Sequence, residues 1–144
     1  MFWRKLGIEF KPHKTGLSKV LGELEAEIME IVWQHDRPVT VREVYEELRE
    51  RRSIAYTTVM TIMSRLAEKE LLQKTQESNY YLYSPVYSRE EFTTKVVSLV
   101  LDGLLADFAQ PVLSHLVEKI QDEDEEKLAQ LEQLIRERRA KGGK

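Results

Sequence analysis

The chain has 144 residues, 42% of them hydrophobic, which fits one or two small domains with a packed core. It contains no cysteine, and this excludes disulfides, thiolate metal sites and a cysteine nucleophile. Residues 1–87 hold 13 basic and 13 acidic side chains, so the net charge of −3 comes from residues 88–144. A neutral first part still permits a basic face opposite an acidic one.

The N-terminal stretch MFWRKLGIEFKPHKTG has no apolar run long enough for a signal peptide. No segment reaches the ~18 uncharged apolar residues that a membrane helix needs. We therefore expect a soluble, cytoplasmic protein without membrane insertion. We expect residues 1–20 to form a flexible N-terminal arm, with a contact to DNA or to a partner as the alternative.

Two helices are predicted next. The first extends from about Gly22 to His35, and Pro38 separates it from the second. Its apolar stripe consists of Leu24, Ile28, Ile31 and Val32. Thr40 and Glu43 form the pattern of a capping box, so the second helix begins there and is predicted to end near Arg52. Its apolar side consists of Val41, Val44, Tyr45 and Leu48.

A third helix is predicted from about Ala55 to Glu70, in a stretch that begins AYTTVMTIMSRL. Its apolar residues recur at helical spacing and form one stripe, Val59, Ile62, Met63 and Leu66. The period then changes, and LLQKTQESNYYLYSPV is typical of two short strands that join near Glu77-Ser78-Asn79. Three short helices followed by a hairpin are the parts of a winged helix-turn-helix domain, which we assign to residues 21–87.

The polar side of the third helix is rich in small hydroxyl groups, which suits a helix that lies in the DNA major groove. Small side chains permit close approach, hydroxyls bond to base edges or phosphates, and threonine methyls pack on thymine methyls. The alternative for this side of the helix is an ordinary solvent-exposed face. The hairpin offers Lys74 as a contact to phosphate or to the minor groove, and the alternative there is an ordinary polar turn. The predicted DNA-binding residues are Thr40, Arg42, Tyr56, Thr57, Thr58, Thr61, Arg65 and Lys74.

Residues 88–144 are predicted to form three helices, beginning near Ser88, at Pro111 and in the acidic run before Leu128. Apolar residues cover most of the circumference of the first helix, and such a helix does not stay bare in water. We therefore predict a helical dimerisation region, with packing on the same chain's own first domain as the alternative. The predicted dimerisation residues are Phe92, Val96, Leu99, Val100, Leu104, Leu113, Leu116, Val117 and Leu131.

The sequence gives little support for an enzyme. His13, His35 and His115 are scattered and have no metal-binding spacing. The acidic run at residues 122–126 lacks the spacing of a calcium loop, and there is no glycine-rich phosphate loop. We expect no catalytic residue, no metal site and no cofactor.

Four stretches together resemble the penicillinase-repressor (BlaI/MecI/CopY) family of bacterial regulators: LGELEAEIMEIVW, PVTVREVYEEL, AYTTVMTIMSRLAEKELL and YYLYSPV. The resemblance implies a dimeric winged-helix repressor that binds an inverted repeat of double-stranded DNA in promoters. It places Thr57, Thr58, Thr61 and Arg65 on the recognition helix and residues 88–120 in the dimerisation helices. It also implies pairing with a membrane-bound metalloprotease sensor that responds to beta-lactams.

This chain departs from the family pattern at two points. Beta-lactam-responsive members are cut at an Asn-Phe bond, whereas the nearest position here is Leu99-Val100. Copper-responsive members carry a Cys-x-Cys pattern, which this chain lacks. The inducing signal, the operator sequence and the regulated genes therefore stay open. The competing hypothesis is a winged-helix module that binds protein and not DNA, in which case binding would not weaken steeply with salt.

Overall fold

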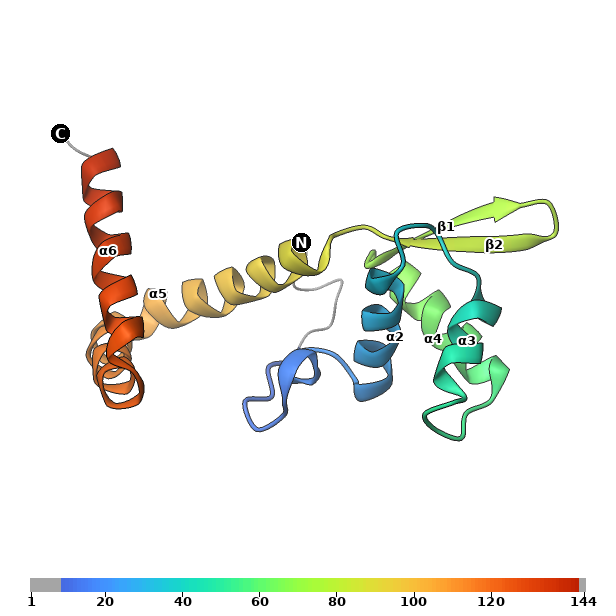
Figure 1. The fold of residues 1–144 in the computed structure, drawn as a ribbon, viewed down its shortest axis with the longest axis horizontal. Helices are drawn as coiled ribbons and strands as arrows, with labels where there is room; N and C mark the ends of the chain where they lie inside the picture. The colour runs from blue at the N-terminus through green and yellow to red at the C-terminus, as the bar shows by residue number, and fades with distance from the viewer. Residues whose placement is uncertain (1–8, 143–144) are drawn as a thin grey trace. The chain divides into compact units, whose positions relative to one another are not determined.

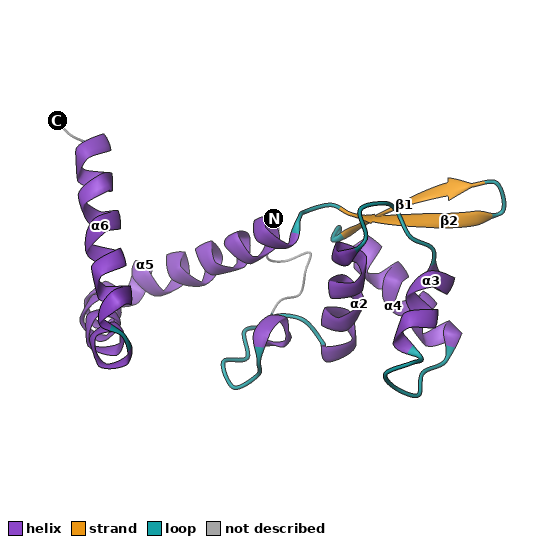
Figure 2. Cartoon of the chain, viewed as in Figure 1, coloured by secondary structure: helices purple, strands orange, loops and turns teal. Residues whose placement is uncertain are grey.

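The computed structural model describes residues 9–142, without the side chains of residues 121–123. These residues belong to two compact units, one ending at Val97 and the other beginning at Ser98. The described part of the chain is mainly helical, with one two-stranded antiparallel sheet (Figures 1 and 2). The predicted fold class, helices with a small hairpin, is confirmed.

Three helices form the centre of the first unit, α2 (Glu23–Gln34), α3 (Val41–Leu48) and α4 (Tyr56–Glu68). They pack on one another beside the hairpin (Figure 1). The predicted helix starts are confirmed to within one residue. The second helix ends at Leu48 and not near Arg52, because the amides of Arg51 and Arg52 both turn back to the Leu48 carbonyl, at 2.9 and 3.0 Å.

The predicted capping box at the start of α3 is present. The Glu43 amide donates to Thr40 Oγ1 at 3.2 Å, and the Thr40 amide donates to the Glu43 carboxylate at 3.0 Å. These two bonds satisfy amides that the first turn of a helix leaves without partners. A similar pair joins Ser88 and Glu91 at the start of the fifth helix, with bonds of 2.8 and 3.0 Å.

The hairpin consists of β1 (Leu72–Glu77) and β2 (Tyr80–Pro85), joined at Ser78-Asn79 as predicted. Val39 extends this sheet, because its amide and carbonyl pair with those of Tyr83 at 2.9 and 2.8 Å. The short extended link between α2 and α3 is thereby tied to the hairpin. Leu72 and Tyr83 are buried at the base, whereas Tyr81 is exposed.

A continuous apolar core fills the first unit. Each helix supplies most of the stripe predicted from its spacing. The two predicted stripe residues that are not buried, Leu24 of α2 and Tyr45 of α3, lie half-exposed. The fully or almost fully buried residues from the three helices are Ile28, Met29, Ile31, Val32, Val44, Leu48, Val59, Met63 and Leu66. No polar or charged side chain is buried among the described residues.

Residues 9–20 were predicted as part of a flexible arm, and the structure gives them a defined fold. The Lys11 amide donates to the Lys19 carbonyl at 2.6 Å, and a short 3₁₀ helix, η1 (Gly16–Lys19), leads into buried Val20. The apolar side chains at the end of this segment pack with the first unit, which sequence spacing alone did not indicate. Residues 1–8 of the predicted arm lie outside the described part.

The helix α5 (Arg89–Glu123) begins inside the first unit. Phe92 is completely buried, and Val96 is 9% exposed. The ring of Phe92 lies 5.8 Å from that of Trp33 on α2. Phe92 and Val96 were predicted to contribute to a dimer interface. The structure instead places both in the core of their own chain, because the first two turns of α5 pack there.

The second unit contains the rest of α5 and α6 (Glu125–Lys141). The backbone of α5 leaves the helical conformation at Phe108 (φ −132°, ψ 38°), shortly before Pro111, so two helical segments meet there as predicted. Leu99, Val100 and Leu131 are half-exposed, while Leu104, Leu113, Leu116 and Val117 are exposed. None of the described side chains from Ser98 onward is buried.

The stretch Arg89–Ile120 is long and apolar enough, by length and composition alone, to cross a membrane. The sequence predicts no such segment, because no stretch reaches the ~18 uncharged apolar residues that a membrane helix needs. The stretch also contains the kink at Phe108. Its apolar surface therefore has two possible occupants, a partner helix or lipid, and the experiments below distinguish them.

Candidate nucleic-acid interface

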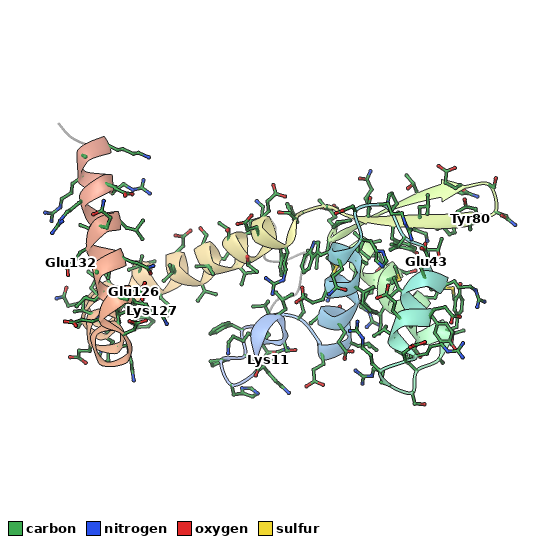
Figure 3. All side chains as sticks on the ribbon, in the orientation of Figure 1. Lys11, Glu43, Tyr80, Glu126, Lys127 and Glu132 are labelled. Atoms are coloured by element: carbon green, nitrogen blue, oxygen red, sulfur yellow. The ribbon has the colours of Figure 1, made fainter. Side chains whose placement is uncertain are left out.

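A groove of about 980 Å³ lies between the start of α3, the polar side of α4 and the hairpin. Glu43 of α3 and Tyr80 of the hairpin both line it and are labelled in Figure 3. The groove brings together six predicted DNA-binding residues, Thr40, Arg42, Tyr56, Thr61, Arg65 and Lys74. Thr57 and Thr58 are exposed on the first turn of α4 and are not among its lining residues.

The α4 helix presents its hydroxyl-rich side to solvent because its apolar stripe is buried. Thr57, Thr58, Thr61 and Arg65 are all exposed. The Thr61 hydroxyl donates to the Thr57 carbonyl at 2.9 Å, which occupies its proton and leaves its lone pairs and methyl group outward. This side of the helix offers acceptors, methyl groups and one guanidinium, a set suited to the major groove.

The start of α3 has a more structural role than its sequence indicated. The Thr40 side chain is occupied by the capping box, so it positions the helix end. The hydrogen bond from Arg37 lowers the pKa of the Glu43 carboxyl; burial opposes this, but the Thr40 amide and the charge of Arg37 also lower it, so the pKa lies below its ordinary value. Glu43 therefore stays ionised and paired, which reduces its repulsion of an anion in the groove.

Four side chains stack across the turn between α3 and α4. The Arg42 guanidinium lies 5.2 Å from the centre of the Tyr56 ring, and Arg49 lies 5.7 Å from that of Tyr45. The two tyrosine rings meet edge to face at 5.5 Å. Glu46 contacts both arginines, at 3.5 and 3.4 Å. Tyr56 thus holds Arg42 beside the first turn of α4.

The hairpin contributes a cation that lies over aromatic rings. Lys74 Nζ is 4.1 Å from the centre of the Tyr81 ring and 6.0 Å from that of Tyr83. The exposed rings of Tyr80 and Tyr81 also line the groove, and sequence reasoning missed both as site residues. The available signal was the strand period, which puts Tyr81 on the same face as buried Tyr83 but nearer the exposed turn.

Exposed Met60, half-buried Ser64 and exposed Glu68 also line the groove on α4. The groove holds three cationic side chains, Arg42, Arg65 and Lys74, and two carboxylates, Glu43 and Glu68. Its positive charge is modest, in keeping with the neutral composition of this part of the chain. Among the described residues, no group of His, Cys, Asp or Glu side chains is placed to hold a metal ion.

Comparison with known proteins adds a family to this geometry. The sequence model described as Penicillinase repressor matches residues 21–137. The transcriptional regulator BlaI of Mycobacterium tuberculosis is 39% identical over 104 residues, which cover 69% of this chain and 73% of the relative. A penicillinase repressor of Staphylococcus aureus is 25% identical over 80 residues, covering 56% and 63%.

Among solved structures, the chain resembles the monomeric form of Bacillus licheniformis BlaI in complex with the blaP half-operator. The TM-score is 0.43 at 25% sequence identity, and the match covers 49% of this chain and 85% of that one.

Proposed function

The chain belongs to the penicillinase repressor family of DNA-binding transcriptional repressors, and on this premise we propose that it represses transcription as a homodimer on an inverted-repeat operator. The family consists of repressors and not of enzymes. The observation that carries the proposal is the exposed threonine and arginine side of α4, which shares a groove with Lys74 of the hairpin. The proposed site of action is the cytoplasm, where the promoter DNA lies.

In this proposal α4 enters the major groove, and its residues divide by role. Thr57, Thr58 and Thr61 contact base edges, because they are small, exposed and close to the start of the helix. Arg65, Arg42 and Lys74 contact phosphates and set the orientation of the domain. Thr40 acts indirectly through the capping box, and Tyr56 through its stack with Arg42.

The proposed dimer uses the apolar residues of the second unit. Phe108 is 57% exposed and Leu134 is 61% exposed, and the exposed set also includes Leu101, Leu104, Leu105, Leu113, Leu116 and Val117. About fifty residues make a poor independent core, whereas two copies together bury the same side chains. Two first units held in one dimer would occupy half-sites about one helical turn apart.

Relief of repression requires only that the dimer be broken. Each first unit alone keeps its contacts with one half-site but loses the gain from binding two at once. A membrane-bound metalloprotease sensor, as in the family, would act in this way on the second unit. The Leu99-Val100 position has no Asn-Phe bond, so we propose that any such cut occurs at a different peptide bond.

The test begins with selection of duplexes from a random library by the full-length protein. The selected duplex and a scrambled one are then titrated by fluorescence anisotropy at two salt concentrations. We expect tight, salt-sensitive binding to the selected duplex at two chains per duplex. Enrichment of no sequence, or binding at one chain per duplex, would contradict the proposal.

A companion measurement addresses the apolar surface. Sedimentation equilibrium without detergent should give a dimer. When lipid vesicles are added, the protein should not bind to them. A chain that partitions into vesicles would assign α5 to the membrane.

A second function, a winged-helix module that binds protein, is favoured by two observations. Glu43 and Glu68 both line the groove, and the first 87 residues are neutral. Such a module would select no duplex, and its binding to a partner would depend weakly on salt. The selection experiment therefore separates the two functions directly.

A further inference from the structure

The first turns of α5 are attached to α2 by a cluster of side chains that we call the joint, consisting of Glu30, Trp33, Tyr87, Arg89 and Phe92. Arg89 donates two hydrogen bonds to the Glu30 carboxylate, Nε to Oε1 at 2.7 Å and Nη2 to Oε2 at 3.3 Å. Trp33 Nε1 donates to the Tyr87 carbonyl at 2.9 Å. The buried Phe92 ring packs against Trp33.

The connection between the hairpin and α5, next to this joint, is short and is held by hydrogen bonds. Only Val86, Tyr87 and Ser88 separate β2 from α5. The Val86 amide donates to the Leu71 carbonyl at 3.0 Å, and Ser88 and Glu91 cap the helix reciprocally. Lys95 Nζ also lies 5.1 Å from the centre of the Tyr87 ring. Backbone or side chain is therefore held at every residue of the connection.

The side chains of the joint differ in how much they stabilise the packing of the first turns of α5 and how much they orient it. The Arg89–Glu30 pair is largely exposed, and such a pair alone adds little stability. The buried Phe92 ring and Val96 anchor the helix, whereas the two arginine bonds and the indole bond are directional. Burial thus holds the first two turns of α5, which belong to the first unit, and the directional bonds orient those turns on α2.

When flexible linkers connect the DNA-binding units of a dimer, the dimer binds operators with many half-site spacings. A linker of variable reach can span each of these spacings. A fixed joint permits one spacing, set by geometry. We propose that the joint is the element that restricts this protein to one operator spacing, with Trp33 and Arg89 as positioning residues. This inference rests on the proposed homodimeric operator binding.

The test measures the affinity of the full-length protein for a series of duplexes in which zero to five base pairs are inserted between the two selected half-sites. Five base pairs turn the second half-site by about half a helical turn. Wild type should lose about a hundredfold in affinity across the series. The double variant Trp33→Phe with Arg89→Ala should lose less than about tenfold. Its affinity for a duplex with one half-site should stay at the wild-type value.

Three further variants make the result specific. Lys14→Ala removes another exposed ion pair of α2, to Glu23 at 3.3 Å, and should keep the wild-type spacing profile. Arg89→Glu places two carboxylates together and should flatten the profile, whereas the exchange Glu30→Arg with Arg89→Glu should restore it. This rescue distinguishes the joint from a loss of positive charge near DNA.

The inference is overturned if the double variant retains the wild-type spacing profile. It is also overturned if single half-site affinity falls in the same proportion, because the cluster would then stabilise the DNA-binding unit and leave spacing untouched. A wild-type protein that binds one half-site as tightly as the repeat would refute homodimeric operator binding itself. That outcome is visible before any variant is measured.

Discussion

The two units of this chain differ in whether their apolar side chains are buried. Up to Val97, leucine, isoleucine and valine stripes from three helices meet in one core, and the first turns of α5 close it with Phe92. From Ser98 onward no described side chain is buried, although leucine and valine are more frequent in α5 than in the three helices of the first unit. Hydrophobic content alone therefore does not define a domain: the first unit completes its own core, whereas the second leaves its apolar side chains exposed and, in the proposed dimer, would bury them against a second copy.

The largest expected effect comes from separating the two units. A protein of residues 1–97 should remain folded and monomeric, because it keeps Phe92 and Val96. It should bind the two-site operator about 10²- to 10⁴-fold more weakly than the full chain, since it loses simultaneous binding. Anisotropy titration measures this, and a single half-site duplex, on which both proteins should bind equally, is the control. Full affinity from the fragment would contradict the proposal that tight operator binding requires a dimer.

The next effect contrasts one phenylalanine from each unit. Phe92→Ala in the 1–97 protein should lower the free energy of unfolding by about 3–5 kcal/mol, the cost of a cavity in a packed core. Phe108→Ala in the full chain should leave the unfolding of the first unit unchanged and raise the dimer dissociation constant. Urea titration and sedimentation equilibrium check the two results. Equal loss of stability in both variants would show that the two regions share one core.

A smaller effect separates residues within the first unit. Thr58→Ala should reduce discrimination at one base pair by about 1–3 kcal/mol, because it would remove the base contact proposed for this residue. Arg65→Ala should weaken binding to every duplex and lower the slope of log affinity against log salt by about one. Both variants should stay dimeric, since neither residue belongs to the second unit. The selected duplex, its single-base variants and a scrambled duplex give the data, and uniform weakening by Thr58→Ala would assign that residue to the backbone.

Local patterns explain what the sequence predicted well. The capping box at Thr40, the stripe of Val59 to Leu66 and the turn at Ser78-Asn79 all depend on residues a few positions apart. The hydroxyl-rich side of α4 follows from that stripe, because burying one face of a helix exposes the other.

Contacts between distant residues explain what was missed. Arg49 to Arg52 are good helix formers, yet α3 stops at Leu48, and Arg52 pairs with Glu27 on α2. Phe92 has the spacing of an interface residue, and its complete burial and its contact with Trp33, far away in sequence, show that it belongs to the core. Tyr80 and Tyr81 became site residues because the hairpin folds beside α4.

The smallest expected effect concerns ion pairs. In the first unit, Lys69 at the end of α4 bonds Glu25 of α2 at 2.8 Å; in the second, Arg136 and Glu132 are 4.0 Å apart and exposed. Burial raises the pKa of the Glu25 carboxyl, but the Lys69 bond and charge together with the Gly22 amide outweigh it, so its pKa lies below 4.5. A depressed pKa stabilises the fold above pH 4.5, and this contribution is lost as pH falls through the folded value. Glu25→Gln should therefore lower the melting temperature at neutral pH, by the equivalent of about 1 kcal/mol or less, and melt nearer to wild type at about pH 3. Glu132→Gln should change neither value, and an equal response of both variants would mean that the Glu25 pair is as weak as a surface pair.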